Sequence, residues 1–136
     1  MDLFTAIDVS ASGMEAQGKR LRIIAENIAN KDSLADRPGL EPYRRRVVTF
    51  RSVLDEITGA SRVEVDRVLP DRRPFELKFD PQHPAADANG YVQLPNVNML
   101  TEMMDLREAQ RSYDANVNVV EAAKAMVRRT IEMLRS

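Results

Sequence analysis

The chain has 136 residues, of which 43% are hydrophobic and 30% are charged, so its composition is that of a globular protein with room for one ordinary domain. Its formal net charge is −1 at pH 7, and the two signs are mixed along the sequence, which argues against a nucleic-acid partner. The chain contains no cysteine, which excludes disulfides, thiolate metal sites and cysteine nucleophiles.

An apolar seam runs through residues 1–32, with its members at alternating spacings of three and four residues. This N-terminal seam comprises Phe4, Ile7, Ala11, Met14, Gly18, Leu21, Ala25 and Ile28. The spacing predicts a long helix with a coiled-coil type of packing face. Large and small residues alternate along the seam, which allows a neighbouring backbone to approach closely. The segment has no basic region followed by a continuous apolar stretch, so we expect no cleaved Sec signal peptide.

The middle of the chain has a different pattern. Residues 33–42 predict a polar loop, because proline and glycine interrupt them. Four short stretches rich in β-branched and aromatic residues then predict strands: Tyr43–Phe50, Arg62–Val68, Phe75–Phe79 and Tyr91–Leu94. We expect them to form one small antiparallel sheet of three or four strands, within a β-rich module of residues 43–96.

A second apolar seam follows in residues 97–136. This C-terminal seam comprises Met103, Leu106, Tyr113, Val117, Val120, Val127, Ile131 and Leu134, and Gln110 and Lys124 interrupt it. No glycine or proline lies between Met99 and Leu134, which predicts a helix of about 36 residues and ~54 Å. A compact chain of this length would have a radius of gyration of only about 14 Å, so we expect an elongated molecule.

These elements predict an α+β fold that is mainly α. The helical segments, residues 1–32 and 97–136, form a helical core, and the β-rich module is inserted between them. The two helices either form one coiled-coil-like hairpin or join helices of other subunits. No apolar run approaches the ~20 residues needed to span a bilayer, so we expect no direct membrane insertion.

Asp80, His83 and Asp87 lie in one short stretch that contains the only histidine of the chain. Such residues can bind a metal or perform acid–base chemistry when they converge in a pocket. Two prolines in the stretch, Pro81 and Pro84, favour a structured turn instead. The chain also lacks a glycine-rich phosphate loop and the common hydrolase motifs. We therefore expect no enzyme activity, no metal, no cofactor and no small-molecule substrate.

Two motifs resemble those of a known family. The stretch NIANKDS carries Asn27, Ala29 and Asn30 of the signature Asn-x-Ala-Asn-x-x-Thr, with Ser33 in the place of the usual threonine. The longer stretch from Asp80 to Leu106 matches through Asp80, Pro81, His83, Pro84, Asp87, Gly90, Tyr91, Pro95, Asn96 and Asn98. On these residues the chain resembles the bacterial flagellar basal-body rod proteins, and among them the short proximal-rod members, over essentially its full length.

The resemblance implies a structural subunit that polymerises helically through its terminal helices. The product would be a hollow, torque-transmitting shaft that spans the periplasm and surrounds the export channel. Implied partners are other copies of this chain, other rod proteins and the flagellar type III export apparatus, with export occurring without a cleaved signal peptide. The alternative that the seams leave open is a soluble homo-oligomeric coiled-coil adaptor.

Two further expectations concern the helices. Because their seams need partners, we expect the terminal helices to be frayed in the monomer and to become ordered on assembly. Asn27 and Asn30 either stop the first helix or bond to the backbones of neighbouring subunits, with Ser33 capping the turn. The second interpretation predicts that removing these asparagines impairs assembly more than folding.

Overall fold

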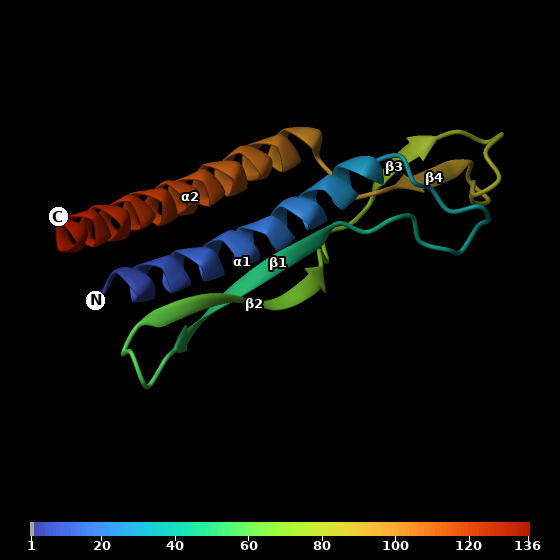
Figure 1. Cartoon of the computed structure of the whole chain (residues 1–136). Helices are drawn as coiled ribbons and strands as arrows, with labels where there is room; N and C mark the ends of the chain where they lie inside the picture. The colour runs from blue at the N-terminus through green and yellow to red at the C-terminus, as the bar shows by residue number, and fades with distance from the viewer. Residues whose placement is uncertain (1) are drawn as a thin grey trace.

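The computed structural model describes residues 2–136 and shows an elongated molecule built on two long antiparallel helices (Figure 1). The helices are α1 (Leu3–Ala29) and α2 (Met99–Arg135), and the two chain ends lie at the same end of the molecule. Four strands lie between them in sequence: β1 (Arg46–Leu54), β2 (Ser61–Pro70), β3 (Glu76–Phe79) and β4 (Tyr91–Leu94). The predicted fold class, α+β and mainly α, is confirmed.

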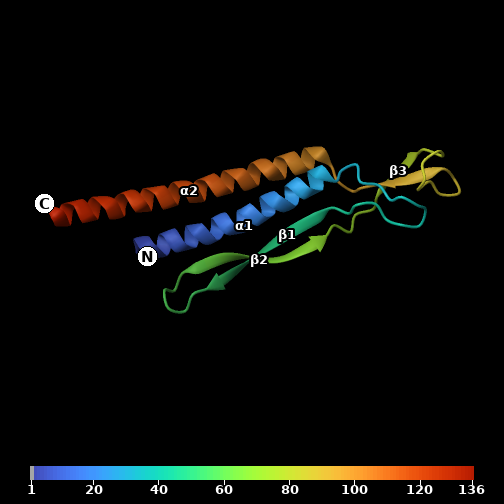
Figure 2. The same ribbon diagram turned by 45° about the vertical axis from the view of Figure 1, so that its right-hand side comes forward.

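Polar side chains cap both helices. The carboxylate of Asp2 accepts a hydrogen bond from the Thr5 amide at 2.7 Å, and the Asn98 side chain accepts one from the Leu100 amide at 2.9 Å. Helix α2 has 37 residues and α1 has 27, so α2 continues beyond the start of α1 at the free end of the hairpin (Figure 2). Neither helix, within the part of the chain that the structure describes, is long and apolar enough to cross a membrane.

The strands form two separate antiparallel ribbons, so the expectation of one sheet of three or four strands is wrong. Strand β1 pairs with β2 from Arg46↔Pro70 to Leu54↔Ser61, and β3 pairs with β4 from Glu76↔Leu94 to Phe79↔Tyr91. Side chains replace strand pairing where the chain passes from one ribbon to the other. The Arg44 guanidinium donates to the carbonyls of Asp71 and Arg73 at 2.8 and 3.2 Å, and so satisfies the backbone there without a sheet.

The β1–β2 ribbon lies along α1, as Figures 1 and 2 show, whereas the β3–β4 ribbon extends the molecule at the opposite end from the chain termini. The Val63 amide donates to the Ser12 hydroxyl at 3.2 Å, which joins β2 to α1. The buried apolar core is small. It comprises Ala16, Ile23, Ile24, Ala60, Val92, Ala109 and Ala123. Many large apolar side chains, among them Phe4, Ile57 and Leu134, therefore stay exposed on the single subunit.

Candidate assembly interface

Small and polar residues line the interior of the helical hairpin. On α1, Gly13 faces Asn116 of α2 so closely that a Cβ atom on Gly13 would lie 2.7 Å from the Asn116 Nδ2. Seven residues later, Arg20 lies 3.9 Å from Asp105 and 3.7 Å from Glu108. Glu102, Ala109 and Ala123 are the buried residues of α2, and with Asn116 they follow one another at intervals of seven. In this part of the hairpin the helices contact each other through small and polar residues.

The two predicted seams lie beside this interior, and no residue of either seam is fully buried. In the N-terminal seam Phe4, Ala11 and Ala25 are exposed, while Ile7, Met14, Gly18, Leu21 and Ile28 are half-buried. In the C-terminal seam Met103, Ile131 and Leu134 are exposed, while Leu106, Tyr113, Val117, Val120 and Val127 are half-buried. Exposed fractions reach 71% for Phe4 and 82% for Leu134. The subunit therefore covers both seams only in part, and the side chains nearest the chain ends are the most exposed.

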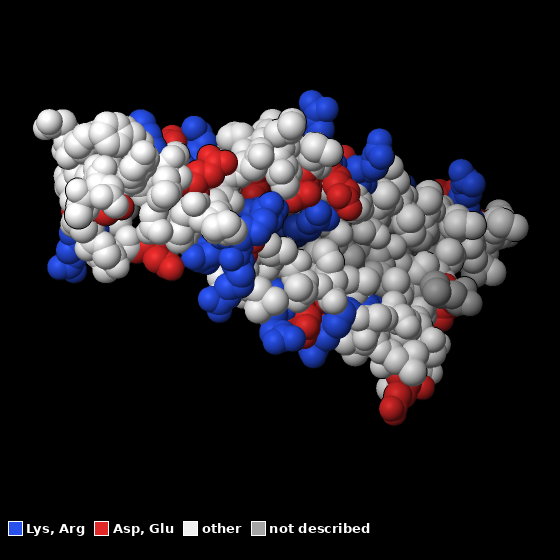
Figure 3. Space-filling view, turned by 180° about the vertical axis from the view of Figure 1, so that it is seen from behind, with Lys and Arg blue, Asp and Glu red and all other residues white. Residues whose placement is uncertain are grey.

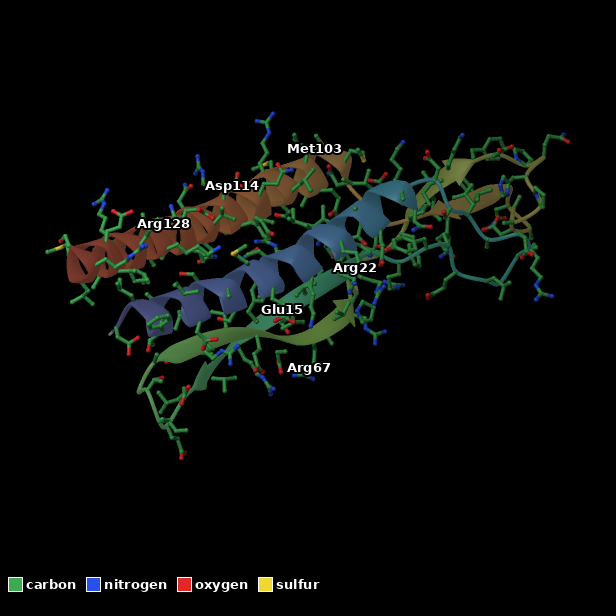
Figure 4. All side chains as sticks on the ribbon, viewed as in Figure 1. Glu15, Arg22, Arg67, Met103, Asp114 and Arg128 are labelled. Carbon is green, nitrogen blue, oxygen red and sulfur yellow. The ribbon has the colours of Figure 1, made fainter. Side chains whose placement is uncertain are left out.

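The two seams meet at the free end of the hairpin in a shallow apolar groove of about 300 Å³. We call it the end groove, and its lining residues are Phe4, Ile7, Lys124, Val127, Arg128 and Ile131. Figure 4 shows Met103, Asp114 and Arg128 in order along α2, with Arg128 towards this free end. No residue of either β-ribbon lines the groove.

At the other end of the hairpin, Asn27 connects α1 to the start of β1. Its side chain is 1% exposed. The Asn27 Nδ2 donates to the Arg46 carbonyl at 2.9 Å, while its Oδ1 accepts from the Arg46 amide at 3.0 Å and from the Tyr43 hydroxyl at 2.6 Å. These bonds use the amide fully within its own chain, because the backbone of β1 takes both its donor and its acceptor. The interpretation of Asn27 as a contact to neighbouring subunits is therefore wrong.

The remaining residues of the signature NIANKDS make the turn that leaves α1. The Asn30 Nδ2 donates to the Glu26 carbonyl at 2.8 Å, and the Ser33 hydroxyl donates to the Asn30 Oδ1 at 3.0 Å. Ala29 is the last residue of α1 and is exposed. Asn30 and Ser33 thus bond to each other and to the helix end, and a hydroxyl at position 33 suffices for this turn.

Arg45 occupies the centre of a charged cluster next to Asn27. Its guanidinium bonds to the fully buried carboxylate of Glu102, to Asp71 at 3.2 Å and to Asp105 at 2.9 Å. Burial disfavours the charged guanidinium, but its bonds to Glu102 and Asp71 and the negative charges of Glu102 and Asp105 together outweigh burial and raise the pKa of Arg45. We call Asn27, Tyr43, Arg45, Asp71 and Glu102 the polar junction.

Asp71 keeps its charge in the polar junction. A hydrogen bond from the Arg73 side chain, with further bonds from the Arg73 amide and from Arg45, lowers the pKa of Asp71 from 3.8 to about 2. The Asp71 amide also donates to the Arg45 carbonyl at 2.7 Å. The junction therefore joins α1, α2 and the linker between the two ribbons, and sequence periodicity gave no sign of it.

The middle motif forms the loop between β3 and β4. The Asp80 amide donates to the Gly90 carbonyl at 2.9 Å, and the Asp87 Oδ1 accepts from the Asn89 and Tyr91 amides at 2.8 and 2.9 Å. Gly90 has a φ of 87°, and a Cβ atom there would lie 2.9 Å from the Phe79 ring, so this position requires glycine. Pro81 also packs against Gly90.

His83 acts as a turn residue within this loop. Its Nδ1 accepts from the Ala85 amide at 3.0 Å, and its carbonyl accepts from the Ala86 amide at 3.0 Å. Pro84 follows it and is exposed. Within residues 2–136 the structure groups no three histidine, aspartate or glutamate side chains in a metal-binding arrangement.

The last residues of the middle motif lead into α2. Pro95 is buried, and the Asn96 Oδ1 accepts from the Arg45 amide at 2.7 Å while its Nδ2 donates to the Asp71 carbonyl at 3.0 Å. Asn98 caps α2. Asn96 thus extends the polar junction to the β3–β4 ribbon, and its role depends on partners more than twenty residues away.

Comparison with known families defines the class of this two-helix protein. Residues 7–32 match the family described as "Flagella basal body rod protein", and residues 88–133 match the family described as "Flagellar basal body rod FlgEFG protein C-terminal". The first match covers most of α1, and the second covers β4 and nearly all of α2. The helical hairpin is thus that of a flagellar rod protein.

Full-length relatives define the family more closely. The chain is 50% identical to the flagellar basal-body rod protein FlgC of Agrobacterium fabrum, in an alignment that covers 98% of this chain and 96% of the relative. It is 38% identical to FlgC of Salmonella typhimurium, with 98% of each chain covered, and 40% identical to FlgC of Aquifex aeolicus, with 97% covered. The chain belongs to the FlgC family of flagellar basal-body rod proteins.

Proposed function

We propose that this chain is a structural subunit of the flagellar basal-body rod, and that it assembles through the uncovered apolar seams of its helical hairpin. One observation carries the proposal. Apart from Ile23 and Ile24, the residues that the two helices bury are small or polar, whereas Phe4, Ile131 and Leu134 remain 71%, 51% and 82% exposed. Apolar side chains that stay exposed along such seams are typical of surfaces that other chains cover.

Burial of the seams supplies the free energy of assembly. A large apolar side chain contributes about 1.5–3 kcal/mol when it passes from full exposure to full burial, and the half-buried seam residues contribute a part of that. A head-to-tail contact that does not close on itself produces a helical filament. Repetition of such contacts among copies of this chain and other rod proteins gives a hollow shaft around the export channel, which transmits torque across the periplasm.

The same proposal covers the route and the organisation of the subunit. The chain reaches the rod through the flagellar type III export apparatus without a cleaved signal peptide, and it acts without catalysis, cofactor or nucleic acid. Residues 1–32 and 97–136 form the helical core, residues 33–42 a loop and residues 43–96 the β-rich module. The hydrogen bond from the Val63 amide to the Ser12 hydroxyl supports a β1–β2 ribbon that is held against the helical core.

Aspartate substitutions in the seams test this function. Leu21→Asp and Ile131→Asp should abolish rod assembly and motility in cells where this chain is the only member of its family, because a charge cannot be buried between subunits. Val119→Asp is the matched control, since Val119 is 46% exposed on α2 and lies outside both seams. The control should assemble normally. Normal assembly of both seam variants would refute the proposed role of the seams.

Electron microscopy and sedimentation of the assembled protein test the alternative of a soluble coiled-coil adaptor. Rod-type filaments support the proposal, whereas a closed dimer that forms through the same seams supports the adaptor. Deletion of the gene separates the two in cells, because a rod subunit is required for a complete basal body. A strain without this chain that still builds rods would contradict the proposed function.

A further inference from the structure

The tip of the β1–β2 ribbon presents an apolar side chain to solvent on a fixed support. Ile57 is 96% exposed, and Leu54 beside it is 60% exposed. The Asp55 carboxylate accepts from the Ile57 amide at 2.9 Å and from the Thr58 amide at 3.3 Å, and the Gly59 amide donates to the Asp55 carbonyl at 2.7 Å. These bonds hold the tip in one turn conformation, so the exposure of Ile57 does not result from a loose loop.

The tip is also acidic, because Asp55 and Glu56 precede Ile57. Figure 3 shows acidic side chains at the end of the ribbon, at the lower right of that view. The end groove has the complementary character. Its base is formed by Phe4, Ile7, Val127 and Ile131, and its polar residues are the cations Lys124 and Arg128. Neither cation forms an ion pair within residues 2–136, and Glu56 forms none there either.

Tip and groove lie at the same end of the subunit but on different sides of α1. Arg62 of β2 lies 3.5 Å from Asp8, next to the groove residue Ile7, and the ribbon continues from there towards the free end. Ser12, which β2 contacts, follows Ile7 by five residues, which corresponds to a rotation of about 140° around the helix axis. A subunit therefore does not place its own tip in its own groove.

We propose that the β1–β2 tip of one subunit docks in the end groove of a second copy of this chain, with Ile57 against the apolar base and Glu56 beside Lys124 and Arg128. This inference rests on the proposed function, because it identifies one contact through which the rod subunits assemble. The contact is heterologous, since tip and groove are different surfaces, and each subunit retains a free tip or a free groove for the next copy. An apolar anchor with a charged rim is a common arrangement at such interfaces.

Cysteine cross-linking tests the contact directly, because the natural chain contains no cysteine. Cells that express an Ile57→Cys chain together with a Val127→Cys chain should give cross-linked dimers of the two chains in isolated basal bodies treated with a short bis-maleimide. As the matched control, Ile57→Cys is expressed together with Val119→Cys, and this pair should give no cross-linked dimers. Basal bodies that contain both chains but give no Ile57–Val127 dimer would overturn the docking proposal while leaving the proposed function intact.

Charge reversal gives a second, independent readout. Ile57→Asp should reduce the amount of assembled rod by about tenfold or more, since it removes the apolar anchor. Glu56→Lys and the double change Lys124→Glu with Arg128→Glu should each reduce assembly, and the combination of all three should restore it. Normal assembly of Ile57→Asp, or no rescue in the combination, would overturn the contact. Normal basal bodies in cells without this chain would instead overturn the proposed function.

Discussion

Replacement of Asn27 by alanine should destabilise the subunit strongly, because its side chain is 1% exposed and its amide makes three hydrogen bonds. The partners are the amide and carbonyl of Arg46 and the hydroxyl of Tyr43, at 2.6 to 3.0 Å. A buried polar group left without a partner costs about 1–3 kcal/mol. Three groups lose their partner, but Tyr43 is half-buried and water can compensate it in part, so the expected loss of stability is about 3–5 kcal/mol. Small domains have a total stability of about 5–15 kcal/mol, so much of it would be lost.

Asn30→Ala is the matched control, because Asn30 lies three residues further along the same chain and is only half-buried. Water can replace its bonds to Glu26 and Ser33, so we expect a loss below about 1 kcal/mol. Urea unfolding of the purified subunit, followed by far-ultraviolet circular dichroism, measures both. With an m-value of about 1–3 kcal/mol per molar, a loss of about 3–5 kcal/mol should lower the urea midpoint of Asn27→Ala by about 1–5 M. Equal midpoints for the two variants would refute the assignment of Asn27 as an internal clamp.

Further predictions concern the charge of Asp71, the glycines of α1 and the free ends of the helices. The pKa of Asp71 is about 2 in the fold, against an ordinary value of 3.8. The Asp71 charge therefore stabilises the fold above pH 3.8, and this contribution disappears as the pH falls towards 2. The urea midpoint of Asp71→Asn should depend less on pH across that range than the midpoint of the unchanged protein. Gly18→Ala should stabilise the isolated subunit by about 0.5–1 kcal/mol, because nothing lies within 4 Å of the added Cβ. Gly13→Ala should increase the stability less, because its Cβ displaces the Asn116 side chain. Thermal unfolding of the two variants measures the difference. If the N-terminal seam packs against neighbours, Gly18→Ala should nevertheless weaken rod assembly, measured as the yield of basal bodies. Hydrogen exchange of the dilute monomer should show protection that declines from the polar junction towards Leu3 and Arg135, and uniform protection would contradict fraying from the free end.

The helices could be predicted from the sequence because their signal is local and repeated. The seam spacing and the lack of glycine or proline after Met99 predicted a helix to Leu134, and the structure has Met99–Arg135. The first helix was expected within residues 1–32 and ends at Ala29, where the Asn30 turn begins. The choice of the face that lies inside the hairpin was not predictable in this way. Glu102 has the appearance of a solvent-facing residue until Arg45, 57 residues away, is placed beside it.

The strands were found from their composition, but their partners were not. β-branched and aromatic residues mark a strand without specifying which neighbour it pairs with. Here the pairing is limited by Arg44 and Asn96, whose side chains occupy the linker carbonyls of Asp71 and Arg73. The middle motif was likewise visible as a turn, because its prolines and Gly90 act locally. The contact of Asn96 with Arg45 depends on the complete fold.

The two ends of the helical hairpin differ in how the subunit itself holds them. The polar junction, with its buried Glu102 and Asn27, fixes the end where α1 stops and α2 starts. The end groove and the overhang of α2 lie at the other end, where the hairpin has only exposed or half-buried side chains. A hairpin anchored at one end can lose helix at its free end without unfolding completely, because the junction does not depend on that region. If the seams assemble as proposed, neighbouring subunits would stabilise the part of the helices that the subunit alone leaves weakest, and the ordering of each subunit would be coupled to its addition to the rod.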